Sequence, residues 1–107
     1  MREHHYYVYI MQSSSRRALY IGMTNNLHRR VFQHKTQEGE GFSGAYDAVR
    51  LVYWESTDEV HKAIAREKRL KNWRREKELW LIARVNPKFQ DLAADWYASE
   101  NLKAQGV

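Results

Sequence analysis

The spacing of hydrophobic and polar positions near the start of the chain is typical of a β-hairpin. Residues 6–11 (YYVYIM) and 18–22 (ALYIG) are rich in aromatic and β-branched side chains, which favour strands, and the polar run QSSSRR between them favours a turn. If the hairpin is symmetric about the serines of this turn, antiparallel pairing places Tyr9 opposite Tyr20. We therefore predict two antiparallel strands joined by a tyrosine pair.

Alternation along these strands gives the hairpin one apolar face and one tyrosine-rich face. Successive side chains of a strand point to opposite sides of the sheet, and directly opposed residues share a side. The apolar face, which we predict to be the core, holds Tyr6, Val8, Ile10, Leu19 and Ile21. The other face holds Tyr7, Tyr9, Met11, Tyr20 and Gly22. This second face requires either a cover or a function.

The stretch that follows the hairpin predicts a helix that carries polar groups on its apolar stripe. Residues 24–35 (TNNLHRRVFQHK) begin with threonine and asparagine, which are good N-caps. At helical spacing, Leu27, Arg30, Val31 and His34 fall along one stripe. Arg30 and His34 are therefore expected to point the same way.

The rest of the chain predicts one more strand and two more helices. The pattern gives a glycine-rich loop at 36–48, a strand at 49–55, and helices at 58–73 and 74–85. Thr57 and Asp58 can cap the first of these helices, and Asn86 before proline ends the second. We predict an α/β (α+β) fold in a single domain over 1–107, with a core at 6–86 and a helical tail at 87–107.

One carboxylate in the 58–73 helix lies where an apolar residue is expected. Projected at helical spacing, Val60, Ala63, Ile64 and Leu70 form an apolar stripe, and Glu67 lies in its middle. A carboxylate on a packing face is costly unless it is paired, binds a metal or opens into a cleft. The alternative is an ordinary ion pair with the residue four positions on, Lys71.

Composition and charge narrow the class of protein. The chain has 107 residues, 43% of them hydrophobic, and four tryptophans, as expected of one packed domain. It has no cysteine, which excludes disulfides, thiolate nucleophiles and cysteine-bound zinc. No apolar run is long enough to span a membrane and no secretory signal is present, so we expect a cytoplasmic protein without a membrane partner.

The net charge of +5 is concentrated between residues 57 and 77, which indicates a polyanionic partner. The candidate nucleic-acid-binding residues in this stretch are Arg66, Lys68, Arg69, Lys71, Arg74 and Arg75. A solvated helix whose charges only maintain solubility is the plainer interpretation.

Taken together, the motifs resemble those of the GIY-YIG nuclease superfamily, most closely its small stand-alone members. The N-terminal nuclease domain of the excision-repair protein UvrC and the catalytic domains of certain homing endonucleases are also similar. Tyr7-Val8-Tyr9 stands where the family has Gly-Ile-Tyr, and Tyr20-Ile21-Gly22 matches the second motif. The other matching residues are Asn26-Leu27, Arg30, His34, Glu67 and Asn86.

The resemblance implies a three-stranded antiparallel sheet flanked by helices and a nuclease that uses one metal ion. The expected substrate is nucleic acid, with DNA the expected form and DNA repair or recombination the expected setting. Glu67 would hold one divalent cation, Mg²⁺ or Mn²⁺, through oxygen with several waters retained. Arg30 would bind the scissile phosphate and stabilise the charge that develops on it.

The resemblance also implies roles for the remaining candidate catalytic residues. Tyr9 and Tyr20 would line the side of the nucleophile, one as general base for a water and the other to orient it. Because a tyrosine is a weak base near neutral pH, an arginine and a metal nearby would have to favour its phenolate. His34 would orient groups or carry a proton, and Asn86 is the last matching position. The plainer interpretations are a cross-strand tyrosine pair, a surface arginine, a solvated histidine and a helix-ending asparagine.

Two other functions fit the same sequence. In the first, the fold binds nucleic acid through its basic helices without cutting it, and Trp73 or Tyr46 stacks on bases. In the second, the protein is an adaptor that docks on a repair or replication protein through Trp80 and Trp96. Salt-sensitive binding that ignores Mg²⁺ and survives Glu67→Ala would favour the binding module.

Overall fold

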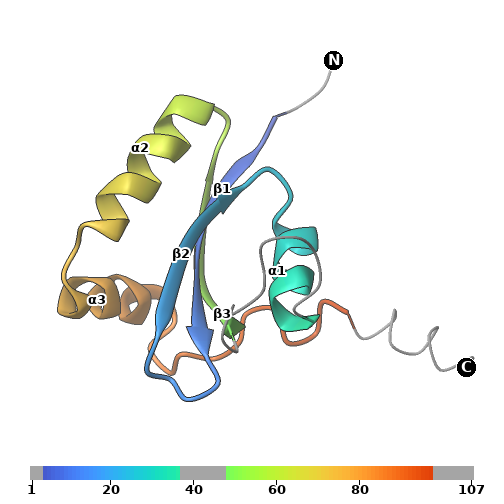
Figure 1. Ribbon diagram of the computed structural model, residues 1–107, viewed down its shortest axis with the longest axis vertical. Helices are drawn as coiled ribbons and strands as arrows, with labels where there is room; N and C mark the ends of the chain where they lie inside the picture. Colours follow the sequence, from blue (N-terminus) through green and yellow to red (C-terminus); the bar gives the residue numbers. More distant parts are fainter. Residues whose placement is uncertain (1–3, 37–47, 98–107) are drawn as a thin grey trace, which may run out of the picture.

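The computed structural model describes residues 4–36 and 48–97, which form a three-stranded antiparallel sheet with helices on both sides (Figure 1). The elements in chain order are β1 (Tyr6–Ser13), β2 (Leu19–Thr24), α1 (Leu27–Thr36), β3 (Ala48–Thr57), α2 (Val60–Lys71) and α3 (Arg75–Val85). β1 is the central strand, between β2 and β3. In Figure 1, α1 lies on one side of the sheet, and α2 and α3 lie on the other.

This arrangement is the α+β fold predicted from the sequence, including the three-stranded antiparallel sheet. Tyr46, a candidate for base stacking, lies outside the described residues. Among the helices that the structure describes, none has the length and apolar character needed to cross a membrane.

The predicted register of the hairpin is wrong by two residues. Tyr9 lies opposite Gly22, and Tyr20 lies opposite Met11. The reason is that the centre of the turn lies one residue later in the chain than predicted, because β1 continues to Ser13 and β2 begins at Leu19. A backbone hydrogen bond of 3.0 Å from Ser13 N to Ala18 O closes this turn.

Within the turn, Arg16 adopts a positive φ of 67°, a conformation that is uncommon for residues other than glycine and is therefore hard to predict from this sequence. Because a slip of two residues restores the alternation, the predicted division of the hairpin into two faces is still correct.

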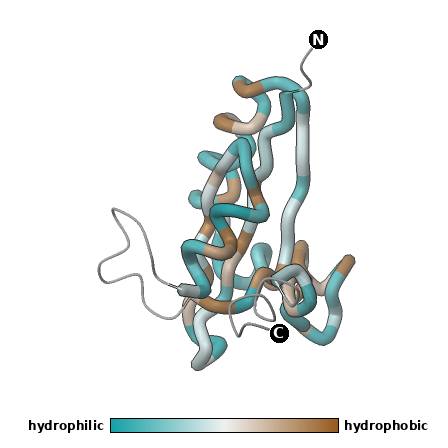
Figure 2. Tube along the Cα trace, turned by 90° about the vertical axis from the view of Figure 1, so that its right-hand side faces the viewer, coloured by the Kyte–Doolittle hydropathy of each residue, from teal (hydrophilic) through white to brown (hydrophobic). Residues whose placement is uncertain are grey.

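Both faces of the sheet are buried, each by a different cluster. The predicted core face packs against α2 and α3 through Val8, Ile10, Ala63, Leu70 and Ile82. The tyrosine-rich face packs against α1 through Tyr9, Met11, Leu27 and Val31. Complete burial of one such aliphatic side chain stabilises the fold by about 1.5–3 kcal/mol. Figure 2, coloured by hydropathy, shows that hydrophobic positions are dispersed among hydrophilic ones along the strands and helices. The tyrosine-rich face is thus covered by a helix.

The helices begin and end near the predicted positions. At the start of α1, the Asn26 side chain accepts a hydrogen bond of 3.1 Å from Arg29 N, so the cap is asparagine. The first residue of α2 is Val60, and its N-cap is Glu59, without a side-chain cap. Thr57 accepts a hydrogen bond from Glu59 N just before it. α3 ends at Val85, directly before Asn86 and Pro87, as predicted.

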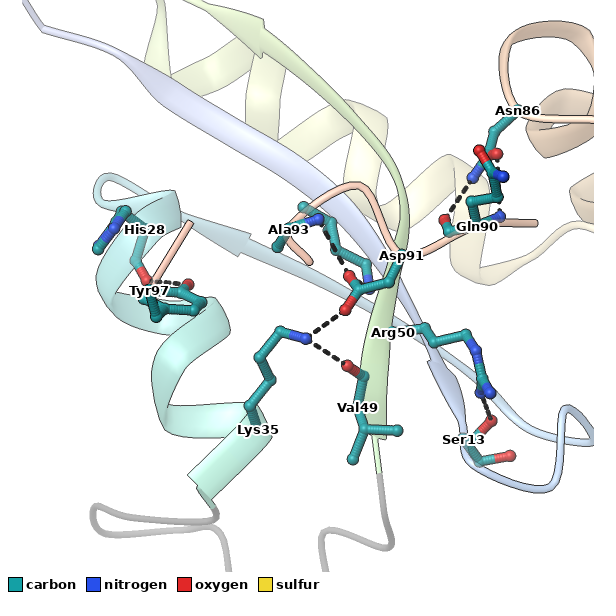
Figure 3. A network of polar contacts seen from close by, with 11 residues as sticks. Ser13, His28, Lys35, Val49, Arg50, Asn86, Gln90, Asp91, Ala93 and Tyr97 are labelled. Carbon is teal, nitrogen blue, oxygen red and sulfur yellow. Dashed lines mark hydrogen bonds and ion pairs between the residues drawn. The ribbon is translucent and has the colours of Figure 1, made fainter. Parts of the chain in front are cut away.

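The segment after α3 does not form the predicted helix over its described part. Residues 87–97 form turns, and they pack against the sheet and α1. The Asp91 carboxylate accepts hydrogen bonds of 3.0 Å from Leu51 N and Ala93 N and forms an ion pair with Lys35 on α1 (Figure 3). The Tyr97 hydroxyl donates a hydrogen bond of 2.7 Å to His28 O, also on α1. The packed core therefore continues beyond residue 86, and its last described contacts hold α1 in place.

Candidate active site

The centre of the candidate site is a buried hydroxyl that contacts two side chains of α1. The Tyr9 side chain is 2% exposed, and its hydroxyl lies 3.0 Å from His34 Nε2. Arg30 Nε donates a hydrogen bond of 3.3 Å to the same oxygen. Arg30 and His34 reach one atom together because they are four residues apart on a helix, as their shared stripe predicted.

Gly22 is what allows Tyr9 to reach this position. A Cβ atom at Gly22 would lie 2.5 Å from the Tyr9 hydroxyl oxygen and 2.6 Å from Cζ. The tyrosine ring therefore crosses β2 over a residue that has no side chain. The glycine of the Tyr20-Ile21-Gly22 motif is thus a positioning residue. The register, which placed Gly22 opposite Tyr9, was the signal needed to find it.

Burial keeps both partners of this contact neutral, whereas the Arg30 charge adds to this effect at His34 and opposes it at Tyr9. Burial raises the pKa of Tyr9 above its usual value of 10.0. The hydrogen bond and charge of Arg30 oppose this shift, and the charge of Glu67 adds to it. Burial, and secondly the Arg30 charge, lower the pKa of His34 to about 4. The expected tyrosine phenolate is therefore not favoured by Arg30 alone. Arg30 donates to the hydroxyl oxygen, and the hydroxyl donates its own proton to His34 Nε2 in the tautomer that carries the imidazole proton on Nδ1.

Glu67 forms one ion pair, and its charge also acts on Tyr9. Its carboxylate forms an ion pair of 3.3 Å with Lys71 Nζ, which is the plainer arrangement expected from their spacing. Its side chain is 23% exposed, and its charge is also among those that raise the pKa of Tyr9.

The donor set around Glu67 suits one kind of metal. In the described part of the chain, no group of three or more histidine, aspartate or glutamate side chains is gathered to hold an ion. Zinc sites need three or four protein ligands, whereas Mg²⁺ is held by one or two carboxylates, waters and substrate phosphate. A partly exposed single carboxylate therefore fits Mg²⁺ or Mn²⁺ bound jointly with a substrate, after Lys71 is displaced.

Tyr20 and Asn86 are not among the side chains shown to contact the Tyr9 hydroxyl. Tyr20 is half-buried on the same sheet face as Tyr9, opposite Met11, so the predicted cross-strand tyrosine pair does not form. Asn86 is 5% exposed, and its amide donates a hydrogen bond of 3.0 Å to Val52 O. The same amide donates a hydrogen bond of 2.8 Å to Gln90 O (Figure 3). These contacts join the end of α3 to β3. The catalytic role of Asn86 stays a prediction beside this structural one.

The candidate nucleic-acid-binding residues differ in how far they are committed to internal contacts. Arg66 forms an ion pair of 2.9 Å with Glu55, and its guanidinium lies 5.4 Å from the centre of the Trp73 ring. Arg75 donates to the carbonyl of Arg17. The other five candidates occupy exposed positions of α2, α3 and the turn between these helices, and they are Lys68, Arg69, Lys71, Arg74 and Arg75. Arg66 therefore supports the fold more than the other basic residues do.

A polar hollow of about 250 Å³ lies beside Arg30, and we name it the arginine hollow. It is lined by Thr24, Asn25, Asn26, Arg29, Arg30 and Gln33. Arg29 is exposed and shares this hollow with Arg30. Two guanidinium groups in one hollow are suited to a phosphate. The two arginines are adjacent on α1, and the turn before α1 completes the hollow that they share.

Comparisons with known proteins agree with this arrangement. The model of the GIY-YIG catalytic domain family matches residues 5–79. A UPF0213 protein of Haloquadratum walsbyi is 37% identical over 78 residues, which are 73% of this chain and 85% of that protein. A UPF0213 protein of Bacillus pumilus is 32% identical over 78 residues, which are 73% of this chain and 79% of that protein. The solution NMR structure of a UPF0213 protein from Bacillus halodurans has the same fold, with a TM-score of 0.54 and 22% identity. The superposed region covers 85% of this chain and 97% of the Bacillus halodurans protein.

Proposed function

Because this chain belongs to the GIY-YIG catalytic domain family, whose members act on nucleic acid, we propose that it is a metal-dependent endonuclease that hydrolyses DNA phosphodiester bonds. The single observation that supports this most is the Tyr9 hydroxyl, which Arg30 and His34 both contact beside the arginine hollow. The likeness to the nuclease domain of an excision-repair protein supports a cytoplasmic role in DNA repair or recombination.

In the proposed reaction, the scissile phosphate lies in the arginine hollow. Arg30 binds its oxygens and stabilises the negative charge that grows as a water attacks phosphorus. Arg29 supplies a second charge to hold the phosphate in place. The bond from phosphorus to the 3′ oxygen breaks, which leaves a 5′ phosphate and a 3′ hydroxyl. A divalent cation at Glu67, when bound, would stabilise the departing 3′ oxygen.

Tyr9 and His34 can activate the water without a phenolate in the resting protein. As the water attacks, its proton passes to the Tyr9 oxygen, and the Tyr9 proton passes to His34 Nε2. His34 is available as an acceptor because its low pKa keeps it neutral near pH 7. Bound phosphate partly neutralises Arg30, which is one cause of that low pKa, so the basicity of the imidazole rises with substrate bound. Tyr20, on the same sheet face, orients the water.

The test is cleavage of plasmid and single-stranded DNA with Mg²⁺ or Mn²⁺. We expect Arg30→Ala and Glu67→Gln each to lower the rate about 10²- to 10³-fold, as the loss of a group that stabilises the transition state does. Matched controls are Arg84→Gln and Glu76→Gln, which change the same charges at exposed positions of α3. Equal cleavage by all four variants, or none by the wild type, would refute the proposal.

A second candidate function, a nucleic-acid-binding module that does not cut, is favoured by the ion pair between Glu67 and Lys71. A glutamate that serves only this pair has no need of a metal. In that case DNA binding would weaken steeply with salt, would not respond to Mg²⁺, and would survive Glu67→Gln.

A further inference from the structure

A second hollow, of about 420 Å³, adjoins the arginine hollow, and aromatic rings form much of its wall. We name it the aromatic hollow. The residues that matter to its chemistry are Tyr7, Trp54, His28, Trp96, Asn25 and Asn26. Its volume is within the range of about 300–1,000 Å³ that is typical of small-ligand sites.

The rings of the aromatic hollow form two pairs from different parts of the chain. On the sheet, Tyr7 and Trp54 meet edge to face, with ring centres 5.9 Å apart. Next to the sheet, His28 of α1 stacks on Trp96 with an interplanar angle of 7° and ring centres 5.8 Å apart. Tyr97 fixes this second pair, since its ring contacts both His28 and Trp96. The two pairs are therefore preformed walls.

Trp54 is an exposed tryptophan on an otherwise buried sheet face. It lies in β3 opposite Tyr9, on the sheet face that carries the candidate site, yet it is 41% exposed, whereas Tyr9 is 2% exposed. An indole left open beside a hollow presents a flat apolar surface on which another flat ring can stack.

The two hollows share a wall. Asn25 and Asn26 line both of them, so the aromatic rings and the two guanidinium groups lie on either side of the turn before α1. A nucleotide has the same two parts, an anionic phosphate and a flat base, joined by a sugar. The exposed amide of Asn25 offers a donor and an acceptor, which are the groups that the edge of a base requires.

We propose that the aromatic hollow binds a nucleobase that is not stacked in a duplex, from the nucleotide whose phosphate lies in the arginine hollow. The inference rests on the proposed function, because it names the form of DNA that the same site takes. A base inside a duplex is covered by its neighbours, so its faces cannot reach the rings of the hollow. The substrate class is therefore single-stranded DNA, or duplex DNA at a flap, a gap or another distortion.

The experiment measures binding without metal, so that no cleavage takes place. Wild type and variants are titrated in EDTA into a short fluorescein-labelled single strand, and anisotropy gives the dissociation constant. We expect Trp54→Ala to weaken binding about 5- to 150-fold, the effect of losing one stacked base, and Trp54→Phe to restore most of it. The control Trp80→Ala removes an exposed indole from α3, outside both hollows, and leaves the affinity unchanged.

Two further readouts separate stacking from charge. Trp54→Ala keeps the wild-type slope of log Kd against log salt concentration, whereas Arg29→Gln lowers this slope by about 1, because only the arginine contacts a phosphate. When one abasic site is moved along the strand, wild-type binding weakens at one position, and Trp54→Ala no longer responds at that position. The abasic series with wild type also serves if Trp54→Ala does not fold.

The proposal is overturned if the abasic series is flat with wild type, or if Trp54→Ala and Trp80→Ala weaken binding equally. Base-dependent binding in EDTA together with no cleavage in Mg²⁺ would support this site and refute the nuclease. Cleavage that is insensitive to Trp54 and to the abasic site would do the reverse.

Discussion

Replacement of Gly22 by alanine tests whether the site depends on the close approach of Tyr9 to β2. The new Cβ would lie 2.5 Å from the tyrosine hydroxyl oxygen and 2.6 Å from Cζ, so the ring must move by roughly 1 Å in a closely packed interior. Because the ring is 2% exposed, that movement displaces neighbouring side chains and lengthens the hydrogen bonds to Arg30 and His34.

The expected cost can be worked from these contacts. Overpacking of this kind costs about 1–3 kcal/mol. The reduced entropy of the unfolded chain returns about 0.4–1 kcal/mol, since Gly22 does not adopt a positive φ and alanine can take its backbone conformation. The net loss of about 1–2 kcal/mol lowers the Tm by about 4–8 °C for each kcal/mol in a domain of this size.

The measurement is thermal and urea unfolding of Gly22→Ala in two backgrounds. In Tyr9→Leu, which lacks all three atoms that the new Cβ would meet, the same substitution should be neutral or stabilising. An equal cost in both backgrounds would show that the clash with Tyr9 is not the cause. If the protein is a nuclease, Gly22→Ala should also lower its activity at temperatures where it remains folded.

Three further predictions concern individual side chains. The unfolded chain protonates His34 below about pH 6.5 but the folded protein does so only near pH 4, so stability should fall as pH drops through that interval. Urea unfolding at about pH 7 and about pH 5 should show a smaller loss for His34→Gln than for wild type, and equal losses would contradict the low pKa. Asn86→Ala, which leaves buried backbone groups without their partners, should cost about 1–3 kcal/mol of unfolding free energy. A variant that folds as stably as wild type but is inactive would instead show that Asn86 is catalytic. Lys71→Met removes the ion-pair partner of Glu67 and should lower the Mg²⁺ concentration needed for half-maximal cleavage, and an unchanged requirement would refute competition between lysine and metal.

The sequence was most informative where strand alternation or helical spacing decides which side chains share a face. Alternation placed Tyr9 and Gly22 on one face of the hairpin, and helical spacing placed Arg30 and His34 on one stripe. Only the fold shows that this stripe meets this face. Register was not, because it depends on a turn closed by the backbone of Ser13 and on a residue with positive φ.

Contacts between distant segments were also beyond local patterns. The side chain of Glu67 forms the ion pair with Lys71 that its spacing allowed, and its role as a metal ligand stays a prediction. Its charge also raises the pKa of Tyr9, a relation that only tertiary structure shows. The described part of the tail had a weakly amphipathic pattern that favoured a helix. It forms turns instead because Asp91 binds the backbone at Leu51, a tertiary contact that outweighs helix propensity.

The contacts that hold α1 have a consequence for the order in which the protein is made. Lys35 and the carbonyl of His28 are synthesised early, but their partners, Asp91 and Tyr97, are among the last described residues to leave the ribosome (Figure 3). Until then α1, which carries Arg30 and His34, lacks its contacts with Asp91 and Tyr97. A nascent chain can thus form its hairpin early, whereas the complete site forms only after Asp91 and Tyr97 have been synthesised.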